Sequence, residues 1–131
     1  MSIFNNNAAE LLILLFFIAT YLFSVLEKLA DWKGTVSYYT NHFQKTILRK
    51  MIPLLLINVV IFEIVVVVLL TIGLYFLVTE DTFLIAKVGL ELSAVTLLMF
   101  LVGQRLAKDY AGAMNITVYF ILNIIGLYIV Q

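Results

Sequence analysis

One stretch constrains this chain more than any other: the apolar run from Met51 to Thr79, which carries a single charge, Glu63, near its middle. About 20 residues at 1.5 Å each cross the hydrocarbon core of a bilayer, so this run predicts a membrane span with a carboxylate close to the midplane. An ionised carboxylate costs at least ~2.5 kcal/mol to insert at that depth. We therefore expect Glu63 to be buried in a helix bundle, paired, protonated or functional.

The composition supports a membrane protein over the whole chain. Of its 131 residues, 64% are hydrophobic and 12% are charged, whereas a soluble domain averages roughly 45–50% and about 25%. We expect residues 1–131 to form one integral membrane domain. The chain has no cysteine, which excludes disulfides, thiol redox chemistry and thiolate metal sites carried by this chain alone. Its first residues lack the basic region and cleavage site of a signal peptide, so the first span is expected to be retained.

Apolar segments predict four spans, at about residues 8–27, 53–79, 82–104 and 111–130. Between the first two, apolar residues recur at three- and four-residue spacing, which predicts an amphipathic helix over about 35–50 that lies in the membrane interface. The expected fold class is all-α: a four-transmembrane-helix bundle with one cytoplasmic interfacial amphipathic helix. We expect Gly73 and Gly126 to ease contact between helices.

Basic residues predict the orientation of the chain. The N-terminal tail and the second loop have none. The first loop and the third loop contain seven basic residues: Lys28, Lys33, Lys45, Arg49, Lys50, Arg105 and Lys108. The positive-inside rule then places loops one and three in the cytoplasm and both termini outside.

Four polar side chains are expected inside the membrane: Glu63, Glu91, Asn123 and Lys87. Glu63, Glu91 and Asn123 each lie roughly 20 Å along a helix from the cytoplasmic end of their span, so they share one membrane layer. Two carboxylates in a low dielectric cannot both ionise cheaply, so such a pair could relay protons or bind a polar ligand head. Alternatively, Lys87 and Glu91 neutralise each other at i,i+4, and a protonated Glu63 bonds to a backbone carbonyl.

A second polar cluster is expected at the cytoplasmic interface, where opposite charges at the ends of spans one and three could clamp these helix ends. The alternative is that these side chains reach the headgroups and determine topology. The members are Glu27, Lys28, Asp31, Gln104, Arg105, Lys108, Asp109 and Tyr110.

The remaining sequence indicates neither a metal site nor a catalytic motif, so the catalytic residues stay unknown. His42 is the only histidine, and one histidine cannot make a typical zinc site; beside Tyr38 and Tyr39, we expect it to contact headgroups. No phosphate-binding, dinucleotide-binding, metalloprotease or hydrolase motif is present, and nothing indicates nucleic-acid binding.

In the order of these segments the chain resembles the DoxX family of small four-span bacterial membrane proteins, in its Bacteroidota-like version. The matching stretches are LEKLADWKG at 26–34, IPLLL at 52–56, the carboxylate of Glu63 and GQRLAKDYAGA at 103–113. The resemblance implies a four-helix bundle in the bacterial inner membrane, with Glu27, Lys28, Glu63, Gln104, Arg105 and Asp109 as its polar positions. It does not imply one activity, because the family is associated with thiosulfate:quinone oxidoreduction, with membrane redox complexes and with membrane-protein assembly. The fold is also similar to that of vitamin K epoxide reductases, whose chemistry uses cysteines that this chain lacks.

Two functions therefore compete. In the first, the chain is an accessory or assembly subunit of a larger membrane complex, in contact with the lipid bilayer and with protein subunits. In the second, it is a quinone-linked oxidoreductase component or a proton-handling protein that uses Glu63 and Glu91. We favour the first, because redox chemistry needs an electron carrier and the chain has no obvious site for one. The chain alone indicates no cofactor, and a membrane quinone is the cofactor that the second function would use. Whether the protein is an enzyme is left open by the sequence.

Overall fold

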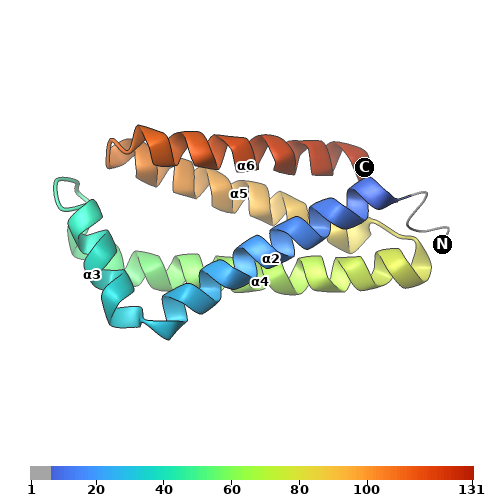
Figure 1. The fold of residues 1–131 in the computed structure, drawn as a ribbon, viewed down its shortest axis with the longest axis horizontal. Coiled ribbons are helices and arrows are strands. Elements are labelled where there is room, and N and C mark those ends of the chain that lie inside the picture. The colour runs from blue at the N-terminus through green and yellow to red at the C-terminus, as the bar shows by residue number, and fades with distance from the viewer. Residues whose placement is uncertain (1–6) are drawn as a thin grey trace.

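The computed structural model describes residues 7–131, and every regular element in that range is a helix (Figure 1). The four long helices are α2 (Ala8–Ala30), α4 (Ile52–Glu80), α5 (Leu84–Leu106) and α6 (Tyr110–Ile129). The short elements are α3 (Trp32–His42) and the 3₁₀ turn η1 (Arg49–Met51). The predicted all-α bundle is confirmed. Each of the four long helices is long and apolar enough to cross a membrane, so this is a small multi-pass membrane protein.

The connection between the first two spans differs from its prediction. Its helix covers Trp32–His42 instead of residues 35–50. The helix begins early because Asp31 caps it, with the Gly34 N–H donating to Asp31 Oδ1 at 3.1 Å. It ends early because the chain turns after Phe43, where the Thr46 hydroxyl donates to the Phe43 carbonyl at 2.8 Å. At both ends, a side chain forms a hydrogen bond with nearby backbone in place of the backbone hydrogen bonds that would continue the helix.

The helices pack in the order α2, α4, α5 and α6, and α2 makes only limited contact with α6. Leu14, Phe17, Leu70, Leu77 and Leu90 are fully buried between them. Gly73 lets α4 approach α5 closely, because a Cβ on Gly73 would lie 2.6 Å from the Ala86 backbone nitrogen. Gly126 likewise lets α6 approach α2, because a Cβ on Gly126 would lie 3.0 Å from Ile13 Cγ2. The predicted role of both glycines in helix contact is confirmed.

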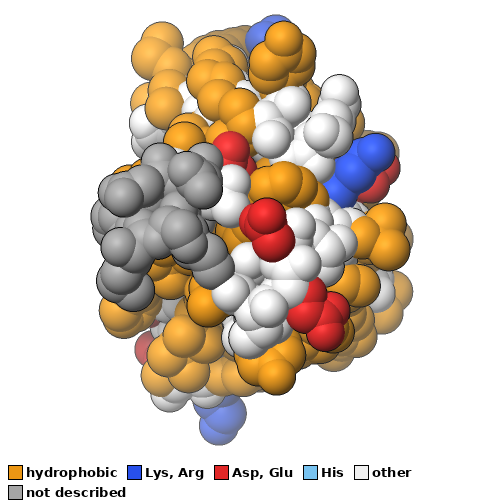
Figure 2. Space-filling view, turned by 90° about the vertical axis from the view of Figure 1, so that its right-hand side faces the viewer, with side chains coloured by type: hydrophobic (Ala, Val, Ile, Leu, Met, Phe, Trp, Pro, Cys, Tyr) orange, Lys and Arg blue, Asp and Glu red, His pale blue; other side chains and the backbone are white. Residues whose placement is uncertain are grey.

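The bundle has two distinct ends. The α3 segment and the α5–α6 turn lie at one end, which we call the α3 end, and the start of α2 and the C-terminus lie at the other with the α4–α5 connection (Figure 1). At this second end, the Asn7 amide donates to Asp81 Oδ1 at 2.9 Å. Figure 2 looks onto the second end and shows acidic side chains near its middle, surrounded largely by hydrophobic ones. Since α3 belongs to the first loop and the α5–α6 turn is the third loop, these two loops share the α3 end of the molecule.

Candidate functional site

The buried carboxylate of Glu63 has an ionic partner from another helix. The Lys28 ammonium, near the C-terminal end of α2, lies 3.0 Å from Glu63 Oε1 in α4. The carboxylate side chain is 1% exposed and the ammonium side chain 12%. Lys28 also donates a hydrogen bond to Ser24 Oγ, one turn earlier on α2. Burial and pairing are two of the outcomes expected for Glu63, whereas Lys28 was expected in the polar cluster at the cytoplasmic interface and instead reaches this carboxylate.

Glu63 keeps unused capacity as an acceptor. Its Oε1 is buried and accepts no directed hydrogen bond from the described residues, so the contact with Lys28 is an ion pair without hydrogen-bond geometry. A buried polar atom that lacks such a bond costs free energy unless something else satisfies it. With the Lys28 ammonium as its counter-ion, the Glu63 carboxylate is suited to accept a further hydrogen bond from a ligand.

The ion pair borders a large cavity, which we call the central cleft. It has a volume of about 960 Å³ and lies toward the α3 end of the bundle. Its walls are mostly apolar, with contributions from all four long helices and from Tyr39 and Phe43 of the α3 segment. The polar lining consists of Thr20, Tyr21, Ser24, Lys28, Tyr39, Asn58, Glu63, Gln104 and Tyr119. An apolar cavity with a few convergent polar groups is the usual form of a small-molecule site.

Two tyrosines place hydroxyl groups on this lining. Tyr21 is buried, and its hydroxyl lies 2.8 Å from Ser93 Oγ and donates to the Ser93 carbonyl at 3.3 Å. This contact ties α2 to α5 across the inner wall of the cleft. In α3, burial raises the pKa of the Tyr39 phenol above its ordinary value, with smaller contributions from Tyr38, Glu63 and Glu27. Tyr39 is therefore a neutral hydrogen-bond donor at physiological pH.

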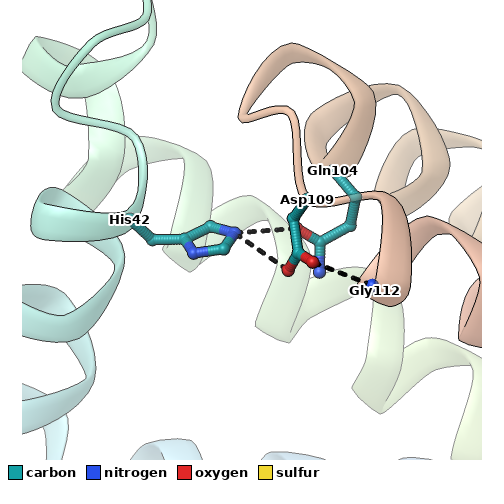
Figure 3. A network of polar contacts seen from close by, with 4 residues as sticks. All are labelled: His42, Gln104, Asp109 and Gly112. Atoms are coloured by element: carbon teal, nitrogen blue, oxygen red, sulfur yellow. Dashed lines mark hydrogen bonds and ion pairs between the residues drawn. The ribbon is translucent and has the colours of Figure 1, made fainter.

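The end of α3 is attached to the turn between α5 and α6 (Figure 3). His42 Nε2 lies 2.9 Å from Gln104 Oε1 and 3.5 Å from Asp109 Oδ2. Because both neighbours are oxygens, Nε2 carries the hydrogen and donates. Asp109 Oδ1 accepts the Gly112 N–H at 2.9 Å, which caps α6. We call this group the His42 clamp. The sequence placed His42 against headgroups and missed the clamp, although Gln104 and Asp109 were recognised as polar positions.

The other polar side chains expected inside the membrane do not gather around Glu63. Glu91 is exposed on the outside of α5 and does not line the cleft, so it does not meet the buried Glu63. Lys87 is half-buried, and no ion pair joins it to Glu91 among residues 7–131. Asn123 is fully buried, as expected, but it donates to the Leu90 carbonyl at 2.9 Å and leaves its own Oδ1 unpaired. Glu63, Glu91 and Asn123 therefore do not solvate one another.

The expected interfacial network between spans one and three does not form within the described part of the chain. Glu27, Arg105 and Lys108 are exposed and make no ion pair there. The Arg105 guanidinium lies 5.3 Å from the centre of the Tyr110 ring, which is a cation–π contact. Asp31 serves as the helix cap described above. The cluster therefore divides into the buried Lys28–Glu63 pair, the His42 clamp and exposed charges.

No group of three or more metal-binding side chains occurs in the described range. Comparisons of the chain with models of known protein families, with curated proteins and with solved structures found no match.

Proposed function

We propose that this membrane protein binds a membrane-dissolved amphiphile in the central cleft, and that isoprenoid quinones are the class of amphiphile to test first. The observation that carries this proposal is the Lys28–Glu63 pair at the border of an apolar cleft of about 960 Å³. This volume is near the upper end of the roughly 300–1,000 Å³ range of ligand pockets. The apolar walls suit a hydrocarbon tail, and the polar groups suit its head.

The chemistry of the lining favours a head group with carbonyl oxygens. Lys28 and the neutral Tyr39 hydroxyl are donors, and Glu63 Oε1 is a buried acceptor without a directed hydrogen bond. A quinone head accepts two hydrogen bonds, and its reduced form donates two. The lining offers donors and an acceptor, so it can match either form. The resemblance to the DoxX family, part of which is associated with quinones, supports the same choice.

The role proposed here is binding by one carboxylate, Glu63. A relay between Glu63 and Glu91 is not supported, because Glu91 lies outside the cleft. Electron transfer to a quinone would need an electron carrier, and the sequence contains no recognisable binding motif for one.

The test is purification of the full chain in mild detergent, with mass spectrometry of the extracted lipids. We expect a quinone at near one per chain, and a rise in melting temperature when a short-chain quinone is added to delipidated protein, since a ligand of the folded state stabilises it. Glu63→Gln should weaken this rise, and Glu91→Gln, a matched change outside the cleft, should not. Absence of quinone from the native extract together with no melting shift would exclude the proposal.

A second candidate is an accessory or assembly subunit of a larger membrane complex, and one observation favours it. Glu91 is a charged side chain on the outer surface of a spanning helix, where lipid offers it no partner. Co-purification of other subunits in fixed ratio, without quinone, would support this function over ligand binding.

We also propose that the α3 end faces the cytoplasm of a bacterial inner membrane and that both termini lie outside. The support is that both basic loops share this end (Figure 1), as the positive-inside rule requires. Because the chain has no cysteine, single cysteines at Lys45 and Glu80 would report the orientation by labelling with a membrane-impermeant thiol reagent. Labelling of Glu80→Cys alone in intact cells is the expected result, and labelling of Lys45→Cys alone would reverse the topology.

A further inference from the structure

Helix α3 borders the central cleft at the α3 end of the bundle. It runs from the end of α2 toward the α5–α6 turn (Figure 1), and Tyr39 in α3 and Phe43 directly after it line the cleft. None of the residues of α3 is buried, whereas each long helix buries several. Contacts at its surface therefore hold α3 in place, and an element held in this way opens more readily than a packed core.

Two side chains attach the end of α3 to the other helices. In the His42 clamp, the imidazole points toward Gln104 in α5 and Asp109 in the α5–α6 turn (Figure 3). The Phe43 ring lies against Gly103, where an added Cβ would be 3.6 Å from it. Gln104 itself lines the cleft. The attachment of α3 is thus made at the border of the cleft, so its release would open the cleft at this border.

Both ends of α3 adjoin non-helical chain. Asp31 alone separates α2 from α3, with φ −140° and ψ 73°, and residues 43–48 form turns before η1. A few residues of this kind at the ends of an element are enough to absorb the dihedral changes of a hinge movement. Helix α3 can therefore move away from α5 without unwinding, once the contacts of His42 and Phe43 are broken.

We propose that α3 is a gate that regulates entry of the ligand into the central cleft, and that the His42 clamp keeps this gate closed. The inference rests on the proposed function, because it concerns access to the same ligand site. His42 is a positioning residue in this gate, since it lies outside the lining of the cleft and acts through Tyr39 and Phe43. The Tyr39 hydroxyl has no hydrogen-bond partner among residues 7–131, so it can donate to a ligand head while the gate is closed.

Ligand binding and closure of the gate are coupled. Tyr39 and Phe43 belong to the wall of the cleft only while α3 lies on the bundle, so a ligand in contact with them binds the closed state better than the open state. The ligand therefore holds the gate closed, and opening of the gate limits how fast the ligand enters and leaves. Loss of the clamp should make the interior of the cleft more accessible even when no ligand is present.

A single cysteine inside the cleft measures this opening, since the chain has no cysteine of its own. Val59→Cys is a small change at a half-buried position of α4 that lines the cleft. The measurement is its rate of labelling by a water-soluble thiol reagent in open membrane fragments, in which both membrane faces are accessible. We expect His42→Phe to raise this rate about fivefold, because the loss of one hydrogen bond shifts the opening equilibrium by roughly this factor.

Three controls separate a gate from a general loosening of the bundle. Val66→Cys makes the same substitution on α4 at a fully buried position outside the cleft, and His42→Phe should not change its labelling. His42→Gln keeps a side-chain N–H donor and should restore most of the slow labelling of Val59→Cys. Asn41→Ala changes an exposed neighbour of the clamp and should leave the labelling slow.

The outcomes distinguish the gate from the proposed ligand. Equal labelling of Val59→Cys with and without His42→Phe would overturn the gate, because the cleft would then be reached by another route. Faster labelling of both Val59→Cys and Val66→Cys would overturn it as well, since the clamp would then serve the stability of the whole bundle. A short-chain quinone should slow the labelling of Val59→Cys by holding α3 closed. If His42→Phe speeds this labelling selectively and the quinone changes neither the labelling nor the melting temperature, the gate stands and the quinone is excluded as its ligand.

Discussion

Lys28 and Glu63 form an ion pair at 3.0 Å between the last turns of α2 and the interior of α4. The pair neutralises the carboxylate that would otherwise be most costly to bury. Its two members are not equivalent, because Glu63 is fully buried whereas Lys28 retains partial exposure at the end of a flexible side chain. A long ammonium side chain can move toward the membrane surface, and the carboxylate cannot.

The asymmetry of this pair predicts unequal effects of its removal. Lys28→Met leaves a buried carboxylate without a counter-ion and should cost about 3–5 kcal/mol of folding free energy. Glu63→Gln should cost less, because Lys28 can then turn toward the surface. The double variant should recover most of the loss of Lys28→Met. Unfolding in detergent of the two single variants and the double variant measures these terms, and a double variant no more stable than Lys28→Met would contradict the coupling.

The His42 clamp predicts a local change in the opening of α3. His42→Phe keeps an aromatic ring for the stack with Tyr38 but removes the bonds to Gln104 and Asp109. Loss of about 1 kcal/mol should speed amide hydrogen exchange in α3 roughly fivefold, with little change in α4 and α5. Mass-spectrometric hydrogen exchange measures this. The control is Asn41→Ala, an exposed neighbour, and equal acceleration in both variants would mean that the clamp does not hold α3.

The close approach at Gly73 predicts opposite outcomes for two glycine substitutions. A Cβ on Gly73 would lie 2.6 Å from the Ala86 backbone nitrogen, whereas a Cβ on Gly103 meets only the Phe43 ring at 3.6 Å. Gly73→Ala must separate α4 from α5 and should cost about 1–3 kcal/mol. Gly103→Ala should be neutral or stabilise by up to about 1 kcal/mol, because alanine favours the helix. Melting temperatures in detergent compare the two, and equal tolerance would show that α4 and α5 are not tightly packed at Gly73.

The sequence predicted the number of spans because length and hydropathy are enough to define them. It did not predict the direction of Glu91, since the rotation of a helix is read from the contrast between an apolar face and a polar face. In α5, apolar residues stand on both faces, with Leu90 and Leu97 buried and Val88 and Val95 exposed. The outward positions Val88 and Val95 are larger and more apolar than the buried Gly89 and Ser93, so packing of small residues decides which face turns inward.

The Lys28–Glu63 pair could not be found by counting along the helices. Lys28 follows the apolar part of its span directly, and this position predicts a place in the headgroup region beside Glu27. In the structure α2 crosses α4 at an angle (Figure 1), and the aliphatic stem of Lys28 lets the ammonium reach a carboxylate more than two turns inside α4. Only the crossing of α2 over α4 brings the two side chains together.

The bond between Tyr21 and Ser93 gives a prediction for the inner wall of the cleft. Tyr21→Phe removes the hydroxyl that lies 2.8 Å from Ser93 Oγ and should cost about 0.5–1.5 kcal/mol. Ser93→Ala should cost a similar amount, and the double variant should cost less than the sum, since each change removes the same bond. The control is Tyr119→Phe, because the Tyr119 hydroxyl forms no hydrogen bond among the described residues. Unfolding in detergent measures all four variants. Strict additivity of Tyr21→Phe and Ser93→Ala would mean that this bond does not connect α2 to α5 in the folded protein.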